Sequence, residues 1–506
     1  MLRILGSPKR FCDGMTRRDM LWAGGLGMFG LGLGEYFRLA QASASDPSRQ
    51  ARPVDRSFGK AKSCILLYVY GGPSQLETCD MKPDAPLEIR GEMRPIRSRL
   101  PGCDVCELLP KLAQVMDRMT VVRSMTHPYP IHGVAYALTG TPQIDIPMEL
   151  NPRDHRHWPF IGSVVDYVYR NGPATNRRPR GAPDNIALPF PFSSRRVGEV
   201  PRAGPYAAFL GNAYNPLWTE FRGRATRTIV KTLQDQRLEV LEPYVGITPD
   251  SRFELAATSR LGPDITIDRL NQRRSLVQQF EQVRRRQDHD ESSQSLDRYR
   301  DLAYRLIGSE QVQRALNLDR ETPQVRESYG MTIFGQAALT ARRLVEAGSR
   351  FVTVFWDEFG LAGSAWDTHW DHYPRMKDEL LPGLDMALYG LINDLDGRGM
   401  LDDTLVLCLS EHGRTPRLSN ARGGGRDHWS QAYSCLFAGG GIARGRVVGR
   451  SDRHAAHVAD RPVSPKDILA TVYHLLGINP ETTLTDRTGR PLPLVQDANV
   501  VAEMLA

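Results

Sequence analysis

Three acid–histidine clusters stand beside short apolar runs in the last third of the chain. The stretch "WDTHWDH" runs from Trp366 to His372, "SEHG" contains Glu411 and His412, and "GRDHW" contains Asp427 and His428. Imidazole nitrogens and carboxylate oxygens are the ligands that zinc, manganese and iron(II) take in proteins. Each motif alone is more often a surface turn, but the three together predict a divalent metal site.

The candidate metal ligands are Asp367, His369, His372, Glu411, His412 and His428. Zinc is the expected ion, with manganese, iron or calcium as alternatives. Arg414 adds a fixed cation suited to an anionic oxygen, or else it pairs with Glu411. Ser74 is either a nucleophile or a helix N-cap, which is the commoner role of such a serine. His127 and His132, in "HPYPIHG", are interpreted equally well as ligands or substrate contacts and as parts of a proline-rich loop.

Alternating strand and helix patterns must position these residues. Apolar runs predict strands over 64–70, 119–125, 350–356, 404–410 and 432–440. Helical spacing predicts helices over 332–348, 376–399 (with Pro382 as an early kink) and 464–477. This alternation indicates an α/β fold with a mainly parallel central sheet flanked by helices. Loops at the carboxyl ends of parallel strands converge, so we expect the clusters to meet there.

The first 44 residues are typical of an export signal. Two arginines, Arg17 and Arg18, precede an apolar run of about 14 residues, which is short for a membrane span. Small residues at 42–44 then offer a cleavage site. The pattern resembles a twin-arginine signal, and a Sec signal or an uncleaved anchor is the alternative. We therefore expect an exported, periplasmic or secreted protein with no stable membrane span after cleavage.

The rest of the chain reads as one domain. Residues 45–61 are a polar linker, and 62–506 form a single domain. Within it, 151–325 is rich in Pro, Arg and charged helical runs, which predicts a variable helical and irregular insertion covering one side of the sheet.

Composition and absent motifs exclude several classes. The net charge is +7, of which residues 1–44 carry +3, so the balance does not favour nucleic acid. No Walker-type loop, GxSxG elbow or HExxH helix is present, which argues against ATPases, α/β-hydrolases and zincins. Cys64, Cys408 and Cys435 read as small buried hydrophobic residues. Cys103 and Cys106 form a lone CxxC pair, which predicts a local disulfide rather than a zinc knuckle.

An ordered run of motifs resembles the domain of unknown function 1501 family over about 62–150 and 328–494. The motifs are "LYVYGGPSQLETCDMKPDAP", "AGSRFVTV", "WDTH", "LSEHGRTP", "GRDHW", "FAGGGIARGRVVGRSD" and "RPVSPKDILATVYHLLGI". That family is abundant in planctomycete-type bacteria and is grouped with alkaline phosphatases and sulfatases. The resemblance implies an alkaline-phosphatase-like fold holding metal above the sheet. It makes Glu411 and His412 the counterpart of a ligand pair, Asp367 and His369 a first-site loop with His372 as a spare, and His428 the late ligand.

The chain departs from that superfamily pattern at two positions. Gly71 and Gly72 stand where an early Asp ligand is expected, and the nucleophile position falls near 130–132, where there is no Ser or Thr. No C-x-P-x-R or S-x-P-x-R stretch is present, which argues against a formylglycine sulfatase.

The resemblance implies an exported metal-dependent hydrolase of a small-molecule or polysaccharide phosphate or sulfate ester. Hydroxide from metal-bound water would attack, and Arg414 would stabilise charge on the transferring group. The alternative is a non-catalytic binding or structural protein that retains a metal-stabilised, sulfatase-like fold. A carbohydrate-binding or carbohydrate-modifying role is a third interpretation.

Overall fold

The computed structural model describes residues 56–172, 182–196, 202–233, 236–255, 310–360, 365–486 and 488–506. The chain divides into two units, 1–56 and Ser57–Ala506, and the second is described below. The predicted export signal lies outside the described residues. Within the described part, no helix combines the length and apolar character needed to cross a membrane.

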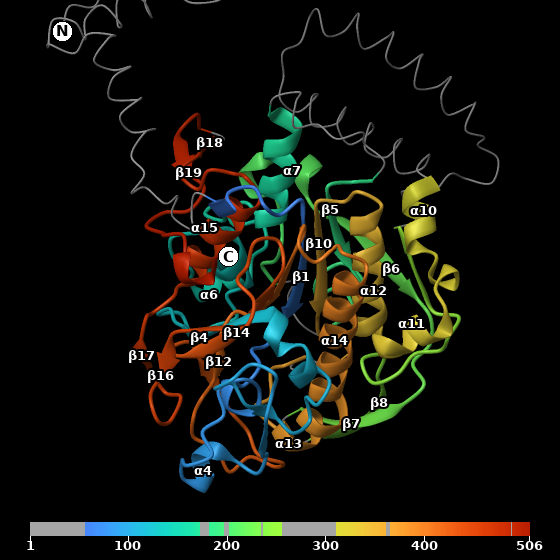
Figure 1. Cartoon of the computed structure of the whole chain (residues 1–506), viewed down its shortest axis with the longest axis vertical. Helices are drawn as coiled ribbons and strands as arrows, with labels where there is room; N and C mark the ends of the chain where they lie inside the picture. Colours follow the sequence, from blue (N-terminus) through green and yellow to red (C-terminus); the bar gives the residue numbers. More distant parts are fainter. Residues whose placement is uncertain are drawn as a thin grey trace, which may run out of the picture. The chain divides into compact units, whose positions relative to one another are not determined.

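A nine-stranded sheet forms the centre of the second unit (Figure 1). Its order is β15 (Arg446–Val448), β4 (Met119–Met125), β14 (Tyr433–Ala438), β11 (Thr404–Leu409), β1 (Ser63–Val69), β10 (Phe351–Trp356), β5 (Asn185–Leu188), β6 (Leu217–Arg222) and β9 (Arg252–Leu255). The strands from β11 to β6 are parallel to one another. β14 is antiparallel to both of its neighbours, and β9 is antiparallel to β6. The predicted class, an α/β protein with a mainly parallel sheet, is confirmed.

Helices cover both faces of the central strands. Phe351 packs against Gly162 of α7 (Ile161–Asn171), and Trp356 packs against Gly383 of α14 (Leu381–Gly397). Side chains five positions apart on a strand face opposite sides of the sheet, so α7 and α14 lie on opposite faces. This explains why β1, β10 and β11 are buried and apolar along their whole length.

The three predicted helices are present. α12 (Ile333–Glu346) lies beside α14 (Figure 1) and begins at Thr332, whose hydroxyl accepts a hydrogen bond from Gly335 N. α15 (Pro465–Leu475) begins with a capping box between Ser464 and Asp467. The kink expected near Pro382 appears as a π-helical turn, Met376–Leu380, directly before α14.

The described part of 151–325 contributes to the sheet itself. β5, β6 and β9 extend one edge, and β7 (Thr228–Leu233) and β8 (Gln236–Leu241) form a separate hairpin. The sequence patterns of 151–325 predict helical and irregular structure and do not predict these strands. The other short elements are α4 (Leu87–Arg90), β2 (Pro95–Ile96), β3 (Val105–Cys106), α5 (Val134–Thr139), α6 (Ile146–Glu149), α10 (Glu310–Leu316), α11 (Pro323–Ser328), α13 (His372–Arg375), β12 (Gly413–Arg414), β13 (His428–Trp429), β16 (Arg450–Ser451), β17 (Val458–Asp460), β18 (Thr483–Thr485) and β19 (Pro491–Pro493).

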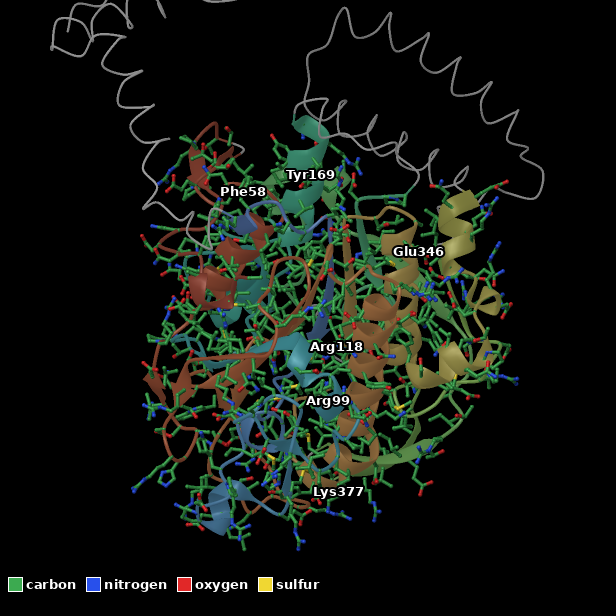
Figure 2. The ribbon with its side chains drawn as sticks, viewed as in Figure 1. Phe58, Arg99, Arg118, Tyr169, Glu346 and Lys377 are labelled. Atoms are coloured by element: carbon green, nitrogen blue, oxygen red, sulfur yellow. The ribbon has the colours of Figure 1, made fainter. Side chains whose placement is uncertain are left out.

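The start of the described chain is anchored to the end of α15. The Phe58 ring meets His474 edge-on at 5.2 Å, and Gly59 N donates to the His474 carbonyl. The Tyr169 hydroxyl of α7 donates to the Leu476 carbonyl. Phe58 and Tyr169 are both labelled in Figure 2, and together they join α7 and the entry to β1 at one helix end.

The predicted disulfide between Cys103 and Cys106 is not formed. Both thiols are free and buried, and their sulfurs have different neighbours. Arg123 Nη2 lies 3.1 Å from Cys103 Sγ, and Met93 Sδ lies 3.5 Å from Cys106 Sγ. The remaining described cysteines are also buried and free, as predicted for Cys64, Cys408 and Cys435.

Candidate metal centre

Five loops meet at one edge of the central sheet. The loops after β1, β10 and β11 leave the carboxyl ends of parallel neighbours. β14 is antiparallel to both β11 and β4, so β4 ends, and β14 begins, at the same edge. The segment before β14 forms β13, which pairs with β12 and places His428 opposite Arg414. The topology therefore brings the three sequence clusters together, as expected for an open parallel sheet.

Asp367 and four histidines, His132, His369, His412 and His428, form a compact group that we call the histidine cluster. Asp367 Oδ1 lies 3.0 Å from His369 Nε2 and 3.1 Å from His428 Nε2. Asp367 Oδ2 lies 3.4 Å from His132 Nε2. The His412 ring stacks on His428 with centroids 4.4 Å apart. Within the cluster, two groups have their ligand atoms within 4.8 Å of one another: His132, His412 and His428, and Asp367, His369 and His428.

Each of the four imidazoles has its Nδ1 beside an oxygen. The contacts are His132 with Glu411 Oε1 (3.0 Å), His369 with Asp427 Oδ1 (2.7 Å), His412 with the Gly413 carbonyl (2.9 Å) and His428 with the Pro130 carbonyl (3.3 Å). A proton on Nδ1 satisfies these oxygens and leaves a lone pair on Nε2. Metal-binding histidines are held in this way.

The Nε2 atom of His412 tests whether a metal ion fits. The His412 side chain is fully buried, and yet its Nε2 atom has no hydrogen-bond partner among the described residues. A buried polar atom without a partner is costly, and a cation at the centre of the cluster would satisfy it. The donor set, imidazole nitrogens with one carboxylate, suits zinc.

The electrostatics of the cluster favour the neutral form of two of its histidines, His412 and His428. Burial lowers the pKa of His428 to about 4 despite its contact with Asp367. Burial, helped by the charges of His428 and Arg414, holds the pKa of His412 well below its usual range. Burial would raise the pKa of Asp367, but Arg414 and His132 hold it well below its usual range. His412 and His428 therefore present lone pairs at neutral pH.

His132, whose sequence context is compatible with both a ligand and a loop residue, is a member of the cluster. It lies between β4 and α5, where the superfamily resemblance would place a nucleophile. Burial would lower its pKa, but Asp367 and Glu411 raise it to about 9. The sequence signal that points to His132 as a ligand is its position in the loop after a predicted strand, since the three acid–histidine clusters also adjoin predicted strands.

Two predicted ligands lie outside the centre. Glu411 accepts hydrogen bonds from Gly71 N at 2.8 Å and faces His132 Nδ1, so it orients His132 rather than pointing inward. His372 Nδ1 lies 2.8 Å from Thr368 Oγ1, and its Nε2 faces Glu77 at 3.5 Å. The chain turns His372 away because Asp371 adopts a left-handed conformation with φ of 48°.

The two predicted catalytic residues are also placed differently from the expectation. Arg414 is fully buried and its guanidinium donates to Asp367 Oδ1 at 2.6 Å and to backbone carbonyls. It is therefore part of the wall of the site and pairs with Asp367 rather than Glu411. Ser74 stands at the N-cap position of a 3-10 helix, Gln75–Glu77, but makes no cap bond. Its hydroxyl is buried and has no hydrogen bond to the cluster or to any other described residue.

The glycine that follows β1 explains why no early Asp is present. A Cβ on Gly71 would lie 2.3 Å from Asp367 N, and its φ is +105°. The two loops are also joined by a hydrogen bond from Trp366 N to the Tyr70 carbonyl. Any side chain at this position would separate the β1 and β10 loops.

We expect Gly71→Ala to lower the free energy of unfolding by about 3 kcal/mol, since a strained φ and a backbone clash each cost roughly 1–3 kcal/mol. Gly348→Ala is the matched control. Gly348 has almost the same φ, +104°, but apart from its chain neighbours no heavy atom of the described residues lies within 4 Å of its Cβ position. The free energy of unfolding of the control should fall by only about 1 kcal/mol, because only the backbone strain at positive φ is added. Equal losses in urea unfolding would contradict the tight approach of the two loops.

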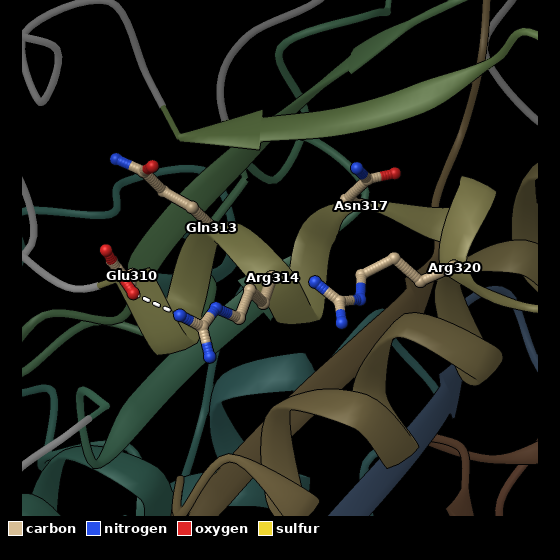
Figure 3. A pocket seen from close by; sticks show the side chains of 5 residues that line it. All are labelled: Glu310, Gln313, Arg314, Asn317 and Arg320. Atoms are coloured by element: carbon tan, nitrogen blue, oxygen red, sulfur yellow. Dashed lines mark hydrogen bonds and ion pairs between the residues drawn. The ribbon is translucent and has the colours of Figure 1, made fainter.

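The cluster is partly open to solvent on one side. The side chains of His369 and His428 are 24% and 21% exposed, whereas those of His132 and His412 are almost fully buried. Asp427, which contacts His369, is 70% exposed. A separate surface depression of about 320 Å³ is lined by Glu310, Gln313, Arg314, Asn317 and Arg320 around α10 (Figure 3). It lies on the β9 side of the sheet and is not part of this centre.

Fold and site together define an α/β protein with a histidine-rich candidate metal centre at the carboxyl ends of its parallel strands. The chain belongs to the family described as "Protein of unknown function (DUF1501)", whose model matches residues 61–505. The predicted family is thus confirmed. No curated protein matches the chain.

Several solved structures are similar to the chain in fold. The PsFucS1 sulfatase from Pseudoalteromonas sp. has 11% identity and a TM-score of 0.38, covering 91% of this chain and 76% of that chain. The protein Ps i-CgsB has 12% identity and a TM-score of 0.37, and the match covers 82% of this chain and 72% of that chain. The lipoteichoic acid synthase LtaP from Listeria monocytogenes has 10% identity and a TM-score of 0.32, and the match covers 89% of this chain and 78% of that chain. The chemistry of the site rests on this chain's own residues.

Proposed function

We propose that the protein is an exported, divalent-metal-dependent hydrolase of a phosphate or sulfate ester. The observation that carries the proposal is the orientation of four imidazoles: each has Nδ1 beside an oxygen, and three have Nε2 within 3.4 Å of an Asp367 carboxylate oxygen. Such an arrangement is typical of metal ligands and their supporting oxygens. We also propose that 1–44 is cleaved as a twin-arginine signal, that 45–61 is a linker, and that 62–506 acts as one domain with 151–325 as its variable region.

Zinc is the ion we propose, because nitrogen-rich sites with one carboxylate suit it best. A divalent ion held there supplies Lewis acidity, which polarises an ester oxygen and lowers the pKa of water. His412 and His132 would hold it from the buried side, and His428 from the partly exposed side.

The residues on the open side would receive the ester. His369 lies between two carboxylates, with Asp367 Oδ1 at 3.0 Å and Asp427 Oδ1 at 2.7 Å. Burial would lower its pKa, but its contact with Asp367 raises it. We assign His369 as the proton donor to the leaving group, because a raised pKa favours the imidazolium, which carries a proton on both ring nitrogens. Trp370, whose ring centroid is 5.6 Å from that of His369, is 37% exposed and borders the same opening.

Water is the nucleophile we propose. The Ser74 hydroxyl is buried and makes no hydrogen bond to any described residue, so no side chain of the described residues acts on it as a general base. The position between β4 and α5 holds His132, which is engaged with Asp367 and Glu411.

Elemental analysis of the exported protein, followed by an ester panel, tests the function. We expect a bound divalent metal and hydrolysis of an aryl phosphate, a phosphodiester or an aryl sulfate. Chelation should abolish the hydrolysis and zinc should restore it. Protein that holds metal but hydrolyses no ester would instead support the non-catalytic alternative. Protein that holds no metal, either as purified or after zinc is added, would contradict both the hydrolase and the metal-stabilised alternative.

A further inference from the structure

The two overlapping groups in the histidine cluster cannot both be filled. They share His428, and its Nε2 has a single lone pair in the ring plane, which binds one ion. The His428 Nδ1 atom cannot serve a second ion because it faces the Pro130 carbonyl at 3.3 Å. A second ion would therefore need other ligands around Asp367.

The space beside Asp367 is already occupied by a cation of the chain itself. The guanidinium of Arg414 is ringed by four oxygens: Asp367 Oδ1 at 2.6 Å, the Gly72 carbonyl at 3.0 Å, the Arg426 carbonyl at 3.0 Å and the Gly71 carbonyl. Three of these are backbone oxygens of the loops that build the site. Arg414 is fully buried, so its charge is fixed in place.

We propose that the centre holds one divalent ion, and that the Arg414 guanidinium takes the place of a second. The inference rests on the metal-binding part of the proposed function. The ion lies with His132, His412 and His428, where the buried His412 Nε2 has no other partner among the described residues. Asp367 is shared: Oδ2 lies 3.4 Å from His132 Nε2 of this group, while Oδ1 accepts from Arg414 and also lies 3.1 Å from His428 Nε2.

The charges explain why the two cations divide Asp367 in this way. An ion bound through Oδ1 with His369 and His428 would stand directly beside the guanidinium, and like charges at such short range repel strongly when both are buried. An ion bound through Oδ2 uses the carboxylate oxygen that Arg414 does not contact. One carboxylate then neutralises both cations, each through a different oxygen.

The oxygen ring makes a further consequence testable. If Arg414 is removed, three carbonyls and Asp367 Oδ1 are left around an empty space, and oxygen ligands of this kind suit Ca²⁺ or Mn²⁺. Arg414→Ala should therefore gain a second ion. Arg414→Lys keeps a positive charge in the same space and should not.

The experiment counts metal ions by elemental analysis after equilibration with Zn²⁺ and then Ca²⁺, each followed by desalting. We expect one Zn²⁺ and no Ca²⁺ per wild-type chain, one Zn²⁺ plus one Ca²⁺ for Arg414→Ala, and the wild-type count for Arg414→Lys. Arg444→Ala is the matched control, because Arg444 is exposed and, among the described residues, forms its ion pairs with Asp396 and Asp402. It should keep the wild-type count.

Two ions in the wild-type chain, or an unchanged count in a folded Arg414→Ala variant, would overturn the inference. If Arg414→Ala does not fold, the wild-type and Arg414→Lys counts decide it: one ion in each supports the inference, and two in either overturns it. These counts are independent of activity. One ion without ester hydrolysis would sink the proposed function and leave the inference standing, whereas two ions with hydrolysis would do the reverse.

Discussion

His428→Ala is expected to lower the affinity of the protein for zinc by about a hundredfold or more. A structural zinc site of four ligands is worth roughly 10–16 kcal/mol, so each ligand contributes on the order of 3 kcal/mol. His428 is shared by both candidate ligand groups. Its loss therefore removes a ligand wherever the ion lies in the cluster.

Competition with a chromophoric chelator measures this affinity, and elemental analysis checks it. His155→Ala is the control, since the side chain of His155 is 92% exposed and its one ion pair with a described residue is with Asp154, at 3.8 Å. The control should bind zinc as the wild type does. Equal affinity in the two variants would show that the cluster is not a metal site, provided that both remain folded by circular dichroism.

The strands that position the site could be predicted because they are buried on both faces, and a short, continuous apolar run is typical of such a strand. β4 spans 119–125 and β10 spans 351–356, within a residue of the ranges expected from apolar runs. Both are buried nearly throughout, so their apolar character is continuous. α15 was equally clear because its cap, proline and closing glycine are local signals.

The edge strands could not be predicted for the opposite reason. β6, "LWTEFR", is mostly half-buried and lacks a continuous apolar run. β5 is only four residues long and follows a Pro- and Arg-rich stretch. Such segments become strands because a neighbouring strand offers hydrogen bonds, which is information that the local sequence does not carry.

The sequence predicts which loops form the site, but not the direction in which each side chain points. The clusters indicated which loops meet, since strand ends converge. The side-chain directions depend on single backbone angles and on carbonyls contributed by other loops. Asp371 turns His372 toward Glu77, and the carbonyls of Gly71 and Gly72 draw Arg414 into the wall. Neither effect leaves a signal in residue type or spacing.

Glu77→Gln is expected to lower the free energy of unfolding by about 3–5 kcal/mol, because it leaves a buried charge unpaired. The side chains of Glu77 and Arg426 are both fully buried, and Arg426 Nε donates to Glu77 Oε1 at 3.2 Å. Arg426 also donates to the carbonyls of Thr415 and Ile89. It precedes Asp427 and His428 in the chain, so this pair anchors the loop that carries the shared histidine.

Glu92→Gln is the matched control on the surface. Glu92 and Lys377 form an ion pair in which both side chains are 50% exposed, and Lys377 is labelled in Figure 2. Exposed pairs contribute roughly 0–1 kcal/mol, so the midpoint of urea unfolding should hardly move. Equal midpoints for Glu77→Gln and Glu92→Gln at pH 7 would refute the anchoring role of the buried pair.

The loss caused by Glu77→Gln should itself depend on pH. Burial would raise the pKa of Glu77, but Arg426 and His372 lower it from the ordinary value of 4.5 to about 2. A carboxyl whose pKa is depressed by folding contributes stability above its unfolded pKa, and this contribution, about 3 kcal/mol, is lost as the pH falls through the folded value. The gap between wild type and variant should therefore be full at pH 7 and shrink steadily between pH 4.5 and 2. A gap that stays constant over this range would mean that the Glu77 carboxylate gains nothing from Arg426, and the buried pair would then hold the loop by shape alone.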